Sequence, residues 1–152
     1  MLNEEEIFNS LFKLALTSKD KEGAVAACIA REGKIIASSA SSDNSSYHAE
    51  YLTINKIIES GNTIKNSDIL YVTVEPCSKR QNIGGTDCCS YIINNGIKNV
   101  IFAVSDPKQT EETQKRLKNA GVRIQQIGDE NIIRKARDLF NKTMVNTNKY
   151  KL

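Results

Sequence analysis

The sequence contains no tryptophan, a single histidine and only two prolines among its 152 residues. It has no apolar run near the roughly 20 residues that a bilayer crossing needs, and its acidic start, Glu4-Glu5-Glu6, is unlike the basic start of a secretion or transit signal. We therefore predict a cytoplasmic protein without membrane contact. The low aromatic content, 6%, also argues against the stacking platforms of single-strand nucleic-acid-binding proteins.

A strong charge of either sign is missing as well. The chain carries 21 Lys and Arg against 18 Asp and Glu, a net charge of +3, which is too balanced for a dedicated nucleic-acid-binding protein. Residues 108–152 are more basic, with 11 basic and 5 acidic side chains. Solvated helix faces account for such an excess, and a surface for an anionic substrate or RNA is the alternative. Length and composition predict one globular domain over residues 1–152.

Helical and strand periodicities alternate along the chain. They predict helices over residues 4–17, 48–60, 88–95, 110–119 and 129–144, and strands over 24–30, 34–40, 69–74, 100–104 and 122–127. A tight turn joins the first two strands as an antiparallel hairpin, and each later pair of strands is separated by a helix. This order predicts an α/β fold, a three-layer α/β/α sandwich with a five-stranded mixed, mainly parallel sheet.

Four cysteines are present, but their arrangement does not suggest disulfides. Cys88 and Cys89 are adjacent, and no secretion signal precedes them. In a reducing compartment such cysteines indicate metal binding or catalysis. Cys28 lies in the middle of an apolar strand, so we expect it to be a core residue.

His48, Cys77 and Cys88 form a candidate metal site. Each lies where a helix begins or a strand ends, and in a parallel sheet these ends meet at one edge. Two thiolates and an imidazole suit zinc and leave a fourth position for water. Glu50, two residues after His48, can reach that water and would shuttle its proton. The alternative is that a lone histidine and scattered cysteines are ordinary buried residues.

These segments together resemble the cytidine deaminase-like superfamily of zinc deaminases. The resemblance is carried by residues 33–36, His48-Ala49-Glu50, the strand ending in Glu75-Pro76-Cys77, and Cys88 with Ile92-Ile93. Ten residues separate the two cysteines, whereas two are usual in the superfamily. That long insertion, beginning Glu75-Pro76-Cys77-Ser78, and residues 96–107 are similar to the pyrimidine deaminases of riboflavin biosynthesis.

The resemblance implies a mechanism and a ligand set. Zinc would be held by His48, Cys77 and Cys88, because the ligand of the family precedes the helix-ending Gly96 by eight residues. Cys89 would then be a packing residue. The metal-bound hydroxide would attack the amine-bearing ring carbon with release of ammonia, and Glu50 would move the proton. The resemblance also implies that the backbone near Ala49 and Glu75 lines the ring pocket, and that the protein is a homodimer or homotetramer.

The substrate is a phosphorylated ribosylaminopyrimidine if the riboflavin resemblance holds. Its phosphate would contact the loop residues Ser78, Lys79, Arg80 and Gln81, although ordinary solvated loop polarity explains them equally well. Gly23-Ala24 stand where the riboflavin enzymes have Asn-Pro, so one ring contact is missing. The alternatives are a cytidine, CMP or dCMP deaminase, a tRNA adenosine deaminase, and a zinc-stabilised partner without activity.

Overall fold

The computed structural model describes residues 1–43, 46–79, 82–145 and 151–152. Within these residues the helices are α1 (Glu4–Ala15), α2 (Ala49–Glu59), α3 (Cys88–Asn94), α4 (Thr110–Asn119) and α5 (Glu130–Thr143). The strands are β1 (Ala26–Arg31), β2 (Lys34–Ala40), β3 (Ile69–Val74), β4 (Asn99–Val104) and β5 (Arg123–Gln126). The ten predicted elements are all present, and their ends differ by at most two residues from the sequence prediction.

The strands form one mixed sheet in the order β2-β1-β3-β4-β5. Strand β1 is antiparallel to both of its neighbours, with Cys28 opposite Tyr71 of β3. The pairs β3–β4 and β4–β5 are parallel. This sheet confirms the predicted α/β fold class, including the antiparallel first pair.

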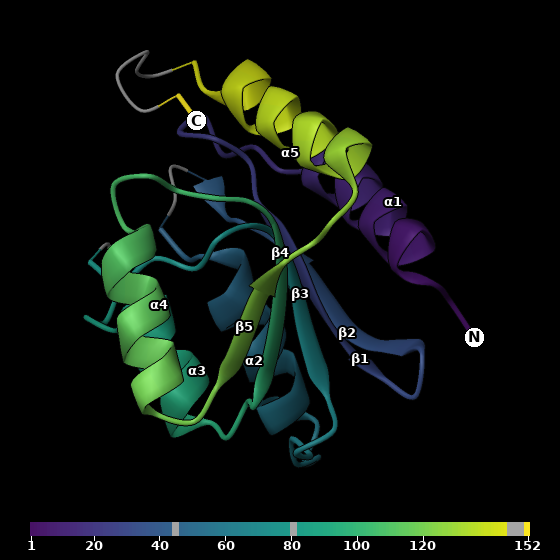
Figure 1. Ribbon diagram of the computed structural model, residues 1–152, viewed down its shortest axis with the longest axis vertical. Coiled ribbons are helices and arrows are strands. Elements are labelled where there is room, and N and C mark those ends of the chain that lie inside the picture. The colour runs from purple at the N-terminus through teal and green to yellow at the C-terminus, as the bar shows by residue number, and fades with distance from the viewer. Residues whose placement is uncertain (44–45, 80–81, 146–150) are drawn as a thin grey trace.

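Helices cover both faces of the sheet, as Figure 1 shows. Helices α1 and α5 pack on one face, over a core that includes Phe8, Cys28 and Phe140. Helices α2, α3 and α4 pack on the other face, over a core that includes Ile29, Ile54 and Leu117. The division follows the alternation of strand side chains, which sends Cys28 and Ile29 to opposite faces. Cys28 is a core residue, as predicted.

Several helices begin at a side chain that accepts hydrogen bonds from their free backbone N–H groups. Asn3 and Glu6 form a reciprocal capping box at α1. Asp87 caps α3, and Asp129 caps α5, where the sequence predicted a cap. His48 occupies the same position before α2, but its side chain makes no capping hydrogen bond there. Among the described residues, no helix combines the length and apolar character that a membrane span requires.

Candidate metal centre

The three predicted metal ligands come from three different elements and meet at one edge of the sheet. His48 immediately precedes α2, Cys77 lies three residues beyond the end of β3, and Cys88 is the first residue of α3. Their ligand atoms all lie within 4.8 Å of one another. His48 Nδ1 is 3.2 Å from Cys77 Sγ and 3.2 Å from Cys88 Sγ. The structure therefore brings together residues that are up to 40 positions apart in the chain.

The chemistry of this donor set fits zinc. A single ring nitrogen faces two sulfur atoms, and one cation among them can satisfy all three groups at once. The pKa of Cys77 is lowered to about 5, chiefly because the Cys88 thiol donates a hydrogen bond to it and also because His48 lies beside it, against the opposing effect of burial. Burial raises the pKa of Cys88. Of these two thiols, Cys77 is therefore the one that loses its proton more readily.

Glu50 lies beside the three ligands and is 4% exposed. It occupies the first turn of α2. Burial raises the pKa of Glu50, and the nearby Cys77 adds to this, while His48 acts in the opposite direction. A buried carboxyl group can both accept and return a proton, which is what general acid–base catalysis requires.

A small cavity of about 30 Å³ lies beside His48 and Cys77. Its lining includes His48, Glu50 and Cys77, together with Gly23 and, from α5, Phe140. Gly23 has φ +108°, and a Cβ there would lie 2.3 Å from the Phe140 ring. Only glycine therefore fits at this position without displacing α5.

The predicted substrate contacts are distributed unevenly around this cavity. Ala49 and Glu75 line it. The backbone N–H groups of Ser78 and Lys79 both donate to Gln109 Oε1, and neither residue is part of the described lining. Ser78 is buried and Lys79 is exposed. Arg80 and Gln81 lie outside the described residues.

The side chain of Glu75 has a second role that its sequence context did not indicate. The carboxylate of Glu75 is 2% exposed and accepts hydrogen bonds from Ser105, Thr110 and Gln114, and from the backbone N–H of Asp106. Two of these donors belong to α4. Glu75 therefore anchors the end of β3, two residues before Cys77, to the neighbouring helix.

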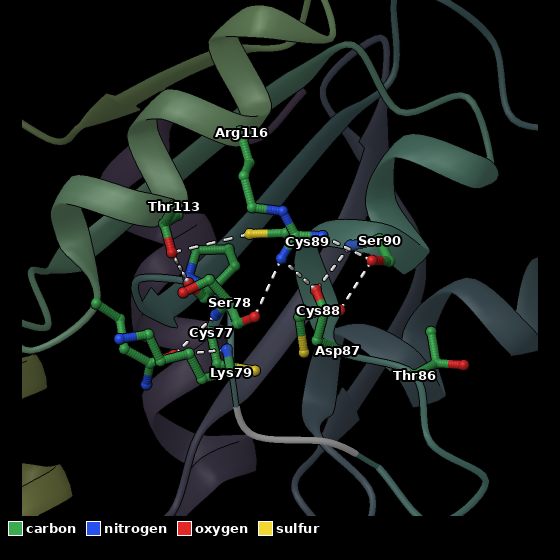
Figure 2. Close-up of polar contacts among 12 residues, drawn as sticks. Cys77, Ser78, Lys79, Thr86, Asp87, Cys88, Cys89, Ser90, Thr113 and Arg116 are labelled. Atoms are coloured by element: carbon green, nitrogen blue, oxygen red, sulfur yellow. Dashed lines mark hydrogen bonds and ion pairs between the residues drawn. The ribbon is translucent and has the colours of Figure 1, made fainter.

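Hydrogen bonds also connect the segments that carry His48, Cys77 and Cys88 to neighbouring parts of the chain. Asn82 is 3% exposed, and its side-chain oxygen accepts a hydrogen bond from the backbone N–H of His48. Figure 2 shows a second group around Cys88, in which Thr113 and Arg116 of α4 point toward the two cysteine segments. Cys89 is fully buried, with its thiol 3.8 Å from Thr113 Oγ1, which agrees with a packing role.

Asn82 and Arg116 were missed at the sequence level. A polar residue in a Gly-containing loop and a basic residue on an otherwise charged helix are each typical of solvated surface. The only sequence signal for their roles is the length of the segment between the two cysteines, because a loop of ten residues needs anchoring to hold its ends.

The chain matches the family model of the cytidine and deoxycytidylate deaminase zinc-binding region over residues 1–104. It is 34% identical to the riboflavin biosynthesis protein RibD of Bacillus amyloliquefaciens over 108 residues, which are 68% of this chain and 27% of RibD. The chain thus spans only about a quarter of the length of this relative.

Solved structures share the fold. One is a diaminohydroxyphosphoribosylaminopyrimidine deaminase/5-amino-6-(5-phosphoribosylamino)uracil reductase from Thermotoga maritima, with TM-score 0.76 and 22% identity over 90% of this chain and 38% of that chain. Another is the dCMP deaminase of cyanophage S-TIM5, with TM-score 0.66 and 20% identity over 82% of this chain and 96% of that chain. The family match shows that the chain belongs to the cytidine and deoxycytidylate deaminase zinc-binding family, and the convergence of one imidazole and two thiols gives it a candidate zinc site.

Proposed function

We propose that this deaminase acts on a phosphorylated ribosylaminopyrimidine of riboflavin biosynthesis and releases ammonia from it. The observation that carries the proposal is the 34% identity with RibD over 108 residues. The ten-residue segment between Cys77 and Cys88 supports it, since such an insertion is a feature in which the riboflavin enzymes differ from the rest of the superfamily.

In this proposal the roles of the residues follow from their positions. His48, Cys77 and Cys88 would hold zinc, which when bound supplies an activated water molecule as the nucleophile. Glu50 would take one proton from the attacking water and deliver it to the ring nitrogen, and then take a second proton from the hydroxyl newly bonded to the ring carbon and deliver it to the amine, which departs as ammonia. Its burial keeps the proton away from bulk water between these two transfers.

The pyrimidine ring would lie in the cavity against Ala49 and Glu75. Both residues line this space beside the metal ligands. Phosphate binding by Ser78, Lys79, Arg80 and Gln81 stays a prediction. The exposed position of Lys79 supports a contact with a group that projects out of the cavity.

A cytidine, CMP or dCMP deaminase is the second candidate. It is favoured by Gly23, which lines the cavity where the riboflavin enzymes have an asparagine that contacts the ring. None of the described residues that line the cavity is a lysine or an arginine. Such a lining suits a substrate whose ring differs from that of the ribosylaminopyrimidine. It also suits a substrate whose phosphate lies outside the described lining.

The two candidates are separated by measuring ammonia release from the zinc-loaded protein. The substrates are the diaminopyrimidine ribotide, cytidine, CMP, dCMP and an adenosine-containing tRNA anticodon stem, with the Glu50→Gln variant as the blank. Turnover confined to the ribotide is the expected result. Turnover of cytosine compounds alone would show that the protein is a cytidine, CMP or dCMP deaminase with the same zinc chemistry. No turnover of any compound would support a non-catalytic role.

We also propose that residues 1–152 act as one domain that assembles into a homodimer or homotetramer. Aromatic rings from α2, α3 and the residue before His48 lie against one another: Tyr47 stacks on Tyr51 with ring centroids 5.5 Å apart, and Tyr51 lies at a tilt to Tyr91 with centroids 4.5 Å apart. These half-buried rings suit a contact between copies. Sedimentation equilibrium tests this: a monomer at all concentrations would refute it. The cytoplasmic location stays a prediction from the sequence.

A further inference from the structure

Arg116 of α4 connects the two segments that carry the cysteine ligands. Its Nη1 donates to the backbone oxygen of Ser78 at 3.0 Å and to Asp87 Oδ1 at 3.0 Å. Ser78 directly follows Cys77, and Asp87 directly precedes Cys88. One guanidinium group therefore spans the two ends of the ten-residue loop, as Figure 2 shows.

The contacts of Arg116 extend into the start of α3. Its Nη2 donates to Ser90 Oγ at 2.7 Å. Ser90 in turn donates its backbone N–H and its hydroxyl to the carboxylate of Asp87, which caps α3. The side chains of Arg116 and Asp87 are 28% and 17% exposed, so this pair is partly shielded from water. Cys88 is the first residue of the helix that these contacts hold.

The helix that carries Arg116 is itself fixed to the cysteine segment. Thr113 Oγ1 donates to the backbone oxygen of Pro76 at 2.8 Å, and Leu117 is fully buried. The backbone N–H of Cys89 also donates to the backbone oxygen of Cys77 at 3.2 Å. Arg116 thus projects from a rigid support onto two segments that already touch each other.

We propose that Arg116 is a positioning residue that holds Cys77 and Cys88 at the separation zinc requires. The proposal rests on the assignment of these two cysteines as zinc ligands. A loop of ten residues constrains the separation of its two ends only weakly, so that separation depends on contacts across the loop, which are the hydrogen bond from the Cys89 N–H to the Cys77 carbonyl and those of Arg116. The planar guanidinium joins the two ends because its donors have fixed directions and can bind a carbonyl and a carboxylate at once.

The expected effect is on zinc affinity. Groups that orient metal ligands without touching the metal change affinity by about 10–100-fold when removed. Arg116→Met keeps much of the length and apolar stem of the side chain but loses every donor, so its zinc dissociation constant should rise by about 10–100-fold. Arg116→Lys keeps the positive charge but loses the planar arrangement of guanidinium N–H donors. Its zinc dissociation constant should therefore lie between those of Arg116→Met and the parent.

Competition with a chromophoric chelator measures the zinc dissociation constant directly and needs no substrate. The matched control is Lys115→Met, which removes the same charge from an exposed position of the same helix. Cobalt substitution adds a spectroscopic readout. The thiolate-to-cobalt absorption of Arg116→Met should be weaker or shifted, and that of Lys115→Met should match the parent.

A second variant keeps the proposal testable if Arg116→Met folds poorly. Asp87→Asn preserves a helix-capping side chain but weakens the contact with Arg116. It should also weaken zinc binding, and in the double variant the two effects should be less than additive. Independent, additive effects would contradict the proposal.

Two outcomes distinguish this proposal from the site assignment. Unchanged zinc affinity in Arg116→Met, even with a lower unfolding temperature of the metal-free protein, would overturn the positioning role. Unchanged zinc affinity in Cys77→Ala and Cys88→Ala would instead overturn the ligand assignment on which it rests.

Discussion

The side-chain oxygen of Asn82 accepts a hydrogen bond at 2.5 Å from the backbone N–H of His48, which lies 34 residues earlier in the chain. The amide nitrogen of Asn82 donates to the backbone oxygen of Thr86 at 2.8 Å. One side chain therefore joins the start of α2, where the histidine ligand lies, to the loop between the cysteine ligands.

Replacing this side chain should destabilise the protein. Asn82→Ala removes the side-chain acceptor of the His48 N–H, while the Thr86 carbonyl keeps only its bond from the backbone N–H of residue 82, and the loss of a partner costs about 1–3 kcal/mol when the group is shielded from water. Urea denaturation of the zinc-loaded protein measures the change in free energy of unfolding. Asn62→Ala, at an exposed position, is the control, and an equally small effect of both variants would contradict the expectation.

Glu50→Gln should abolish most turnover without releasing the metal. The amide cannot accept and return a proton, and general acid–base catalysis of this kind supplies a factor of about 10²–10⁴. Turnover is measured by ammonia release on whichever substrate the parent accepts, and metal content by atomic absorption. Glu59→Gln, at an exposed position of the same helix, should behave as the parent. A turnover loss below tenfold in Glu50→Gln would argue against the shuttle role.

Zinc should stabilise the folded protein, and the stabilisation should grow with the logarithm of the free zinc concentration. A ligand that binds only the folded state adds about 2.7 kcal/mol when its concentration is 100 times the dissociation constant. Thermal unfolding after chelator treatment, repeated at increasing zinc concentrations, measures this shift. Cys77→Ala removes a ligand, so its unfolding temperature should respond little to zinc. A response equal to that of the parent would place the metal elsewhere.

Asp68 should contribute to acid stability at the opposite end of β3. Burial acts to raise the pKa of this carboxyl, but Arg31, which donates two hydrogen bonds of 2.8 Å, and the backbone N–H of Lys65 outweigh it and hold the pKa below its ordinary 3.8. The contribution is therefore present above pH 3.8 and is lost as the pH falls through the lowered pKa of the folded state.

The Asp68→Asn variant tests this pH dependence. Its free energy of unfolding should lie below that of the parent at neutral pH, and the difference should shrink below pH 3.8. Denaturation curves between pH 3 and pH 7 provide the comparison, and Asp138→Asn at an exposed position is the control. A difference that grows as the pH falls would contradict the assignment.

The elements and the three residues of the candidate metal site were predictable from the sequence because each depends on local signals. Ile69–Val74 is a continuous run of mainly β-branched and apolar residues, which indicates a strand covered on both faces. His48 and Cys77 stand out because few residue types bind zinc and because they lie at the ends of predicted elements.

The residues that hold the ligands in place were not predictable in the same way. Arg116 and Asn82 act through contacts with residues 29 to 38 positions away, and those partners are set by how α4 and the long loop pack. A basic residue on a helix with many charges carries no local sign of such a contact. Glu75 was assigned to the pocket wall, which it does line, but its four hydrogen-bond donors became visible only in the folded chain.

Because β3 pairs with β4, which follows it in the chain, the metal site can be completed only late in synthesis. All three metal ligands lie within the first 88 residues, but β4 ends at Val104 and α4 begins only at Thr110. A growing chain on the ribosome therefore contains the complete ligand set before it contains the strand and the helix that fix the position of Cys77. The three candidate ligands are therefore synthesised early. The arrangement of these side chains that suits zinc can form only after roughly three-quarters of these 152 residues have been made.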